Sequence, residues 1–302
     1  MSFKNAFKLL LSRFRYVWAI LAYLLVMFIV LLSLGLTFLL PVIRVLSEAG
    51  VGEMLNTALI AFLNGGTIVG LFSAFQEVII TIGNVFATDS KTFVNSMLFV
   101  LLVATIAYRF IMGLYELPLV SVIQGFMSDN ARYSYMPKYV SWFSKSVRFS
   151  LIKMLVMTIY DALMYVIVFF IGRLFGRISV ILAPTALSLA LLIFLSLRYS
   201  LISAWSPSVV VEDKKIFPAL WFSVKYAFRH FGSLFSLFFI VWVLAFALNI
   251  FVGIFTFGAG LMVSVPMTMY FINLVNMTFF YGRTGKSYYL DGAVFTQELR
   301  KK

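Results

Sequence analysis

Long stretches without a charged residue are the feature of this sequence that most constrains its fold. Residues 16–43, 92–108 and 178–197 contain no Asp, Glu, Lys or Arg, and neither do the 52 residues from Phe231 to Gly282. One helical crossing of a bilayer needs about 20 predominantly apolar residues. A fold in water would have to bury these runs on every face. The sequence therefore predicts an all-α polytopic membrane protein.

Composition supports a single membrane-embedded domain over residues 1–302. The chain is 63% apolar with a mean hydropathy of +1.02, whereas an average soluble domain is about 45–50% apolar. No charged, mixed stretch is long enough to fold separately in water. Cysteine is absent and His230 is the one histidine, which excludes disulfides and Cys-ligated metals. We therefore expect no metal site and no cofactor.

The apolar runs divide into six predicted spans. The first ends before Pro41 and the second before Pro118. The final run would be about 78 Å long as one helix, too long for one crossing. The glycines in residues 258–260 therefore predict a tight hairpin within it. The predicted spans are approximately residues 17–40, 93–117, 154–171, 178–197, 234–257 and 261–281.

The basic residues indicate the topology. With six spans, 19 Lys and Arg lie on the side that holds both termini and four lie on the other side, while Arg109 lies inside a span. Because cytoplasmic loops carry an excess of Lys and Arg, both termini are predicted to be cytoplasmic. The net charge of +13 is explained by this asymmetry, so we expect no nucleic-acid partner.

Residues 42–91 are predicted to lie outside the cytoplasm. Within them, residues 58–82 are apolar enough for a seventh span but contain polar Asn64, Gln76 and Glu77. A crossing there would move the basic cluster at 132–153 to the outer side, against the charge bias. Re-entrant or peripheral helices are therefore favoured, and a seventh span stays the alternative.

Three basic stretches rich in aromatic residues each precede a span. They comprise residues 3–18, 136–153 and 217–231. Their composition predicts interfacial amphipathic helices on the cytoplasmic side, with Lys and Arg toward lipid headgroups and aromatic rings toward acyl chains. The bilayer is thus a predicted partner, with anionic headgroups at these helices. The repetition reflects either duplication or the ordinary composition of a span entry.

A further pattern runs from Arg198-Tyr199-Ser200 through residues 207–213 (PSVVVED) to residues 219–223 (ALWFS). It resembles the membrane domain of some bacterial glycerophosphoryl diester phosphodiesterases and related six-span inner-membrane proteins, most clearly over residues 196–290. The resemblance implies a fold and a location in a bacterial inner membrane. It implies no enzymatic activity, since the soluble domain that carries that family's catalytic Glu and His has no counterpart here.

Arg109 and Asp161 are charged residues inside predicted spans. At helical spacing, Arg109 shares a stripe with Glu116, and Asp161 shares one with Thr158. The two spans are consecutive and antiparallel, so an Arg109–Asp161 ion pair is predicted. Such a pair would either fix the packing of the helices or belong to a polar site for an ion, a proton or a headgroup.

Amide side chains add to the polar positions in the last two spans. Asn249, Asn273 and Asn276 are expected to form hydrogen bonds between helices, and they also suit a polar site. The predicted intramembrane binding residues are Arg109, Glu116, Thr158, Asp161, Asn249, Asn273 and Asn276. No catalytic constellation is recognisable.

These features favour a non-enzymatic bacterial membrane protein with an accessory, regulatory or membrane-homeostasis role. A partner membrane protein or a second copy of the chain would fit that role. The alternative is a transporter or permease-like component for a lipid or small amphiphile, favoured by the polar stripes. An enzyme acting on lipid headgroups, with outer acidic residues holding a metal, is a third hypothesis.

Overall fold

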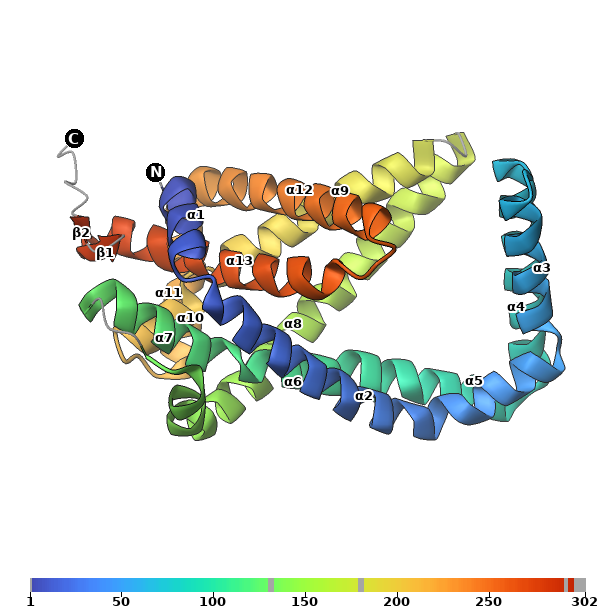
Figure 1. Cartoon of the computed structure of the whole chain (residues 1–302), viewed down its shortest axis with the longest axis horizontal. Coiled ribbons are helices and arrows are strands. Elements are labelled where there is room, and N and C mark those ends of the chain that lie inside the picture. Colours follow the sequence, from blue (N-terminus) through green and yellow to red (C-terminus); the bar gives the residue numbers. More distant parts are fainter. Residues whose placement is uncertain (1, 130–132, 179–181, 291–292, 296–302) are drawn as a thin grey trace. The chain divides into compact units, whose positions relative to one another are not determined.

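The computed structural model describes residues 2–129, 133–178, 182–290 and 293–295, and nearly all of them are helical (Figure 1). Within this part of the chain, two short antiparallel strands follow the last helix, β1 (Tyr288–Leu290) and β2 (Ala293–Phe295). The all-α prediction is confirmed.

Six helical segments among the described residues are long and apolar enough to cross a bilayer. Each overlaps one predicted span, and the shortest has 24 residues, or about 36 Å at the rise of an α-helix. The chain is therefore a multi-pass membrane protein. The segments are Arg15–Glu48, Ser90–Asp129, Tyr135–Gly176, Thr185–Val211, Phe231–Phe255 and Leu261–Thr284.

Helices extend beyond several predicted span ends. Pro41 lies inside α2 (Arg15–Glu48), and Pro118 lies in the first turn of α7 (Glu116–Asp129). Proline is tolerated in a first turn because those N–H groups have no partner within the helix. Inside an apolar helix of a membrane protein a proline is also accommodated. Pro41 was therefore a poor marker of a helix end, whereas Pro118 lies close to the break between two helices at Tyr115.

The chain divides into two compact units. Unit 1 comprises Met1–Leu25 and Phe110–Lys302, and unit 2 comprises Val26–Arg109. In unit 2, α3 (Val51–Leu63) packs against α4 (Ile68–Thr88). The predicted extracytoplasmic segment is thus helical. Since α4 is about 32 Å long, its length suits a crossing as well as a surface position, and its extracytoplasmic placement stays a prediction.

The second long segment is interrupted. It begins in unit 2 with α5 (Ser90–Leu98) and a π-helix, η1 (Phe99–Ala107). It continues through α6 (Tyr108–Leu114), and a turn at Tyr115 separates α6 from α7. The regular stripe of residues predicted along this span therefore does not hold, because a π-helix and a break both change the angular position of the residues after them.

Long helices form the apolar part of unit 1 (Figure 1). α9 (Leu182–Ile202) packs against α8 (Tyr135–Ile178) and α12 (Phe231–Phe255), and α12 packs against α13 (Leu261–Thr284). The predicted hairpin between the last two helices is confirmed. Gly258 has a φ of 88° in its turn, a left-handed conformation that glycine adopts without a steric penalty.

The core of unit 1 lies around short helices that sequence analysis left in loops after the spans. Eleven of the 14 residues of α7 are buried, as are six of the seven in α10 (Trp205–Val211). Both are mainly apolar, and their buried polar residues include Glu116 and Ser121 of α7 and Ser206 and Ser208 of α10. The ring of Trp205 packs against Phe149 of α8, with 4.9 Å between their centroids. These buried helices position the surrounding long ones.

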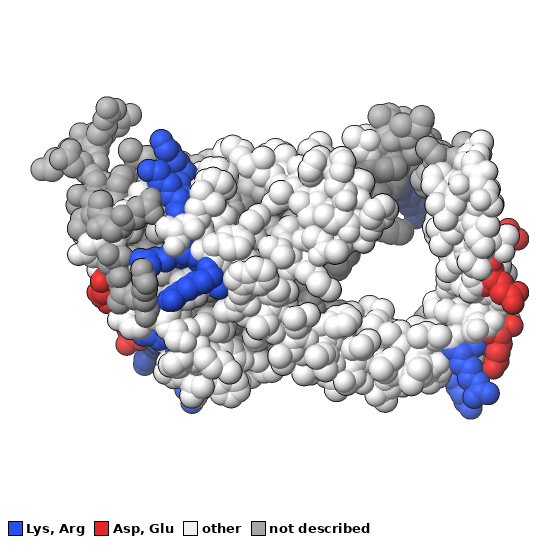
Figure 2. Space-filling model, in the orientation of Figure 1, with Lys and Arg blue, Asp and Glu red and all other residues white. Residues whose placement is uncertain are grey.

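Two of the three predicted interfacial stretches form separate helices before a span, α1 (Ser2–Ser12) and α11 (Ile216–Arg229). α1 packs along α13 and buries Leu9 and Leu10. The middle stretch instead continues into its span as the 44-residue α8. In Figure 2, basic side chains gather over the end of unit 1 that carries α1, while residues 231–282 of the α12–α13 hairpin carry no charge.

Candidate functional site: a polar cavity within the helices of unit 1

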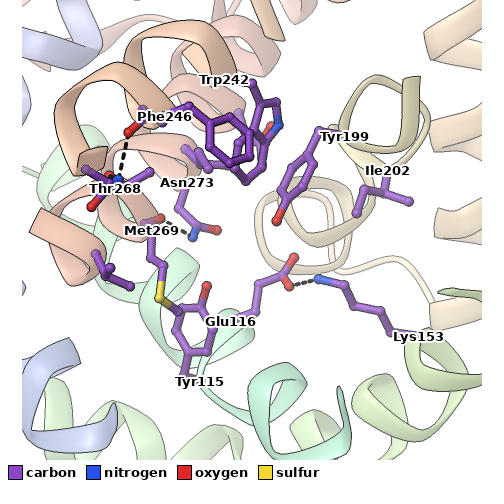
Figure 3. A pocket seen from close by; sticks show the side chains of 15 residues that line it. Tyr115, Glu116, Lys153, Tyr199, Ile202, Trp242, Phe246, Thr268, Met269 and Asn273 are labelled. Atoms are coloured by element: carbon purple, nitrogen blue, oxygen red, sulfur yellow. Dashed lines mark hydrogen bonds and ion pairs between the residues drawn. The ribbon is translucent and has the colours of Figure 1, made fainter. Parts of the chain in front are cut away.

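Four of the seven predicted polar residues line one cavity of about 320 Å³ in unit 1 (Figure 3). They are Glu116, Asn249, Asn273 and Asn276. The cavity lies among α7, α8, α9, α12 and α13. Its remaining lining residues are mainly aromatic and aliphatic: Tyr115, Lys153, Tyr199, Ile202, Trp242, Ala245, Phe246, Val265, Thr268, Met269 and Ile272.

Helices α6 and α8 approach each other closely beside the end of the cavity that carries the charged residues. A Cβ atom at Gly113 would lie 2.8 Å from the Cβ of Ser150 and 3.0 Å from its Cα. The Ser150 hydroxyl donates a hydrogen bond to the carbonyl of Phe110. Glu116 follows Gly113 by three residues and Lys153 follows Ser150 by three. The contact therefore brings these two charged residues together.

Glu116 and Lys153 form an ion pair at the cavity wall (Figure 3). Their side chains are 10% and 18% exposed, so both charges are largely removed from solvent. Buried charges are normally paired in this way because an isolated one is costly. Sequence analysis identified Glu116 but not Lys153, which it counted among the basic interfacial residues. The available signal was its position, directly before the first residue of a span.

Asn249 is fully engaged in joining α12 to α13. Its Nδ2 donates to the carbonyl of Ala245 at 2.7 Å and to Oγ1 of Thr268 at 3.2 Å. Its Oδ1 accepts a hydrogen bond from Ser264 at 2.6 Å. The predicted role of Asn249 in holding two helices together is confirmed.

Two other polar groups of the cavity wall have no hydrogen-bond partner among the described residues. They are Oδ1 of Asn276 and Nε1 of Trp242. Asn276 is 6% exposed, and the nearby Asn273 amide donates to the carbonyl of Met269 at 2.9 Å. An unsatisfied buried polar group costs about 1–3 kcal/mol. Both atoms are buried within the wall, so a bound molecule would reach them only if the side chains of Trp242 and Asn276 turn toward the cavity.

Asp161 and Thr158 lie on α8 and do not line the cavity. Both carboxylate oxygens of Asp161 accept from Nη1 of Arg198 on α9, at 3.2 and 3.1 Å. Thr158 donates to the carbonyl of Met154 at 2.8 Å. Sequence analysis missed Arg198 because it placed that residue just past the end of a span. The predicted Arg109–Asp161 pair joins residues assigned to different units and stays a prediction.

His230 lies between α11 and α12, with its ring 5.0 Å from that of Tyr226 between centroids. Burial, followed by the positive charges of Arg283 and Arg229, lowers the pKa of His230 below its usual value. The neutral imidazole is therefore favoured in the folded protein. Within the described residues, no group of three or more His, Asp and Glu side chains is placed to hold a metal ion.

Comparisons with protein-family models, with curated proteins and with solved structures found no match to this chain. The resemblance to the membrane domain of glycerophosphoryl diester phosphodiesterases therefore stays a prediction.

Proposed function

We propose that this protein is a non-enzymatic bacterial inner-membrane protein that binds a small amphiphile in the cavity of unit 1, in a regulatory or membrane-homeostasis role. The observation that carries the proposal is a mainly apolar cavity that borders the Glu116–Lys153 pair, with the unsatisfied Nε1 of Trp242 and Oδ1 of Asn276 buried in its wall. A ligand that accepts from the indole and donates to the amide would satisfy both, which favours a hydroxyl- or amide-bearing headgroup.

The charge and size of the cavity narrow the ligand class. Because Glu116 and Lys153 neutralise each other, a ligand with net charge would remain uncompensated, at a high cost in a low dielectric. A neutral or zwitterionic molecule is therefore preferred. The volume of about 320 Å³ lies at the small end of ligand pockets, which are typically about 300–1,000 Å³ and mainly apolar. It suits a headgroup or the end of an acyl chain.

Mass spectrometry of molecules that co-purify in mild detergent tests this proposal. The double variant Trp242→Phe/Asn276→Leu removes the donor and the acceptor while keeping an aromatic ring and a similar volume. We expect it to lose the amphiphile that the wild type retains. Trp221→Phe is the matched control, since Trp221 lies on α11 and is 73% exposed. Equal retention by the wild type and the double variant would contradict the proposal.

A transporter or permease-like component is the second candidate. It is favoured by the ionisable Glu116–Lys153 pair at the cavity, because such residues within membrane helices often mark pathways. Uptake of the co-purified amphiphile into proteoliposomes distinguishes the two roles. Uptake that the double variant Glu116→Gln/Lys153→Met abolishes would favour transport, and binding without uptake would favour the regulatory role.

A further inference from the structure

A groove on unit 1, separate from the cavity, lies between α8 and the start of α11. Its volume is about 620 Å³. Segments about 70 residues apart in the sequence form its two sides. The lining combines cations with apolar side chains: Lys145, Arg148, Leu151, Ile152, Lys215, Ile216, Phe217 and Pro218.

Two of the three cations in this groove are available to a ligand. Nζ of Lys145 contacts Oδ1 of Asp213 at 2.7 Å, which offsets its charge. Arg148 and Lys215 are exposed, and within the described parts of the chain no acidic side chain forms an ion pair with either of them. The groove therefore presents a net positive charge that one anionic group would neutralise.

An exposed apolar stripe on α8 leads away from these cations. Leu151, Leu155 and Ile159 are 44%, 59% and 65% exposed. They follow Arg148 at intervals of three and four residues, so they lie on one face of the helix. After Lys153, residues 154–172 of α8 carry one charged side chain, Asp161, which is paired with Arg198. The cations thus lie where an apolar helix passes into a basic one, which is the level at which lipid headgroups interact with a membrane helix.

We propose that this groove binds an anionic phospholipid, with its phosphate between Arg148 and Lys215 and an acyl chain along Leu151, Leu155 and Ile159. The cations select the negative headgroup, and the stripe requires a long apolar chain that a soluble phosphate lacks. Phe217, which is 66% exposed at the same groove, provides further apolar contact beside the headgroup. This site goes beyond the cavity and does not depend on the function proposed for it.

Native mass spectrometry of the purified full-length protein tests the proposal. The protein in detergent is mixed with equal amounts of dioleoyl phosphatidylglycerol and dioleoyl phosphatidylcholine, and the ratio of the two bound lipids is measured. We expect the wild type to retain the anionic lipid preferentially. Since one Lys or Arg near an anionic surface contributes about five-fold to binding, Arg148→Ala/Lys215→Ala should lower the ratio by about 5- to 25-fold.

A charge-matched control removes two other exposed cations from the same region. Lys225→Ala/Arg229→Ala lies on α11 outside the groove and should change the ratio less than two-fold, well below the effect expected for the groove variant. Far-UV circular dichroism verifies that both variants stay folded. Equal ratios for the groove variant and the control would overturn the proposal.

A second arm separates a lipid from a soluble phosphate. Excess glycerol 3-phosphate should fail to displace phosphatidylglycerol, and displacement would overturn the lipid proposal. Leu155→Gln places an amide in the acyl path and should lower retention about two- to four-fold, in line with lost apolar contact. Leu174→Gln is its control, because Leu174 is also exposed on α8 but lies 26 residues along the helix from Arg148 of the groove. Equal losses in both variants would overturn the proposed acyl path.

Discussion

Removing one member of the Glu116–Lys153 pair is expected to destabilise unit 1 strongly. The two side chains are 10% and 18% exposed, so Lys153→Met leaves a largely buried carboxylate without its cation. Breaking a buried pair in this way costs about 3–5 kcal/mol. The pair borders a cavity, which partly hydrates the remaining charge, so we expect the lower end of the range, about 3 kcal/mol. Glu116→Gln should have a comparable effect, because it leaves the largely buried ammonium group of Lys153 without its anion.

The double variant Glu116→Gln/Lys153→Met distinguishes an ion pair from two independent packing contributions. With both charges removed, no charge is left uncompensated, and replacing a buried pair by neutral residues is often nearly neutral. We therefore expect the double variant to be more stable than either single variant. Since each single variant is expected to cost about 3 kcal/mol, the coupling free energy should be at least about 3 kcal/mol, at or above the upper end of the range seen for residues in direct contact.

Unfolding of the purified protein by SDS, followed by far-UV circular dichroism, measures these free energies. The four proteins of the cycle are compared in the same detergent and at the same ionic strength. Lys8→Met is the control for loss of a cation, since Lys8 is exposed on α1. Strictly additive single effects, or single effects below about 0.5 kcal/mol, would refute the argument that the buried pair holds α7 against α8.

Three further predictions concern other contacts of unit 1. Gly113→Ala should lower the free energy of unfolding by about 1–3 kcal/mol, because its methyl group would clash with Ser150. Gly176→Ala is the control and should not lower this free energy, because Gly176 has open space around it. Equal effects of the two variants in SDS unfolding would contradict the predicted clash. The pKa of His230 is lowered in the folded state. Its neutral form should therefore contribute stability that is complete above about pH 6.5 and is lost as the pH falls through the folded pKa. His230→Gln should remove that part of the acid sensitivity, which thermal unfolding from pH 8 to pH 4 would measure. Asp161→Asn should cost about 3 kcal/mol by leaving its α9 partner uncompensated, and an unchanged SDS unfolding curve would show that the pair contributes little.

The helices were predictable from the sequence because each depends on a property local to the chain. A predominantly apolar run of about 20 residues is sufficient to indicate a helix of bilayer length, and each of the six helical segments of that length overlaps a predicted span. The hairpin at Gly258 was equally local, since a 52-residue run cannot be one crossing. The ends of helices were less predictable. α2 continues past Pro41 because the surrounding apolar residues remain favourable in a helix.

The partners of the charged residues were not predictable, because they depend on packing between distant segments. Glu116 and Lys153 are 37 residues apart, and their meeting depends on the close approach of Gly113 to Ser150. Asp161 contacts Arg198, a residue that the charge count assigned to a loop. Counting Lys and Arg by side determines where a loop lies but does not show which cation at a span end turns inward.

The positions of these charges also explain why α8 can hold ionised groups within an apolar bundle. Lys153 and Asp161 are eight residues apart on this helix, about two turns, and each pairs with a different neighbour, α7 in one case and α9 in the other. An isolated charge at either position would be expensive in hydrocarbon, so each pair is favourable only when the correct neighbouring helix is in place. Two such constraints on one helix disfavour rotation or axial sliding of α8, because either movement would separate both pairs at once. The ionised residues of α8 thus specify its register even where their net contribution to stability is small.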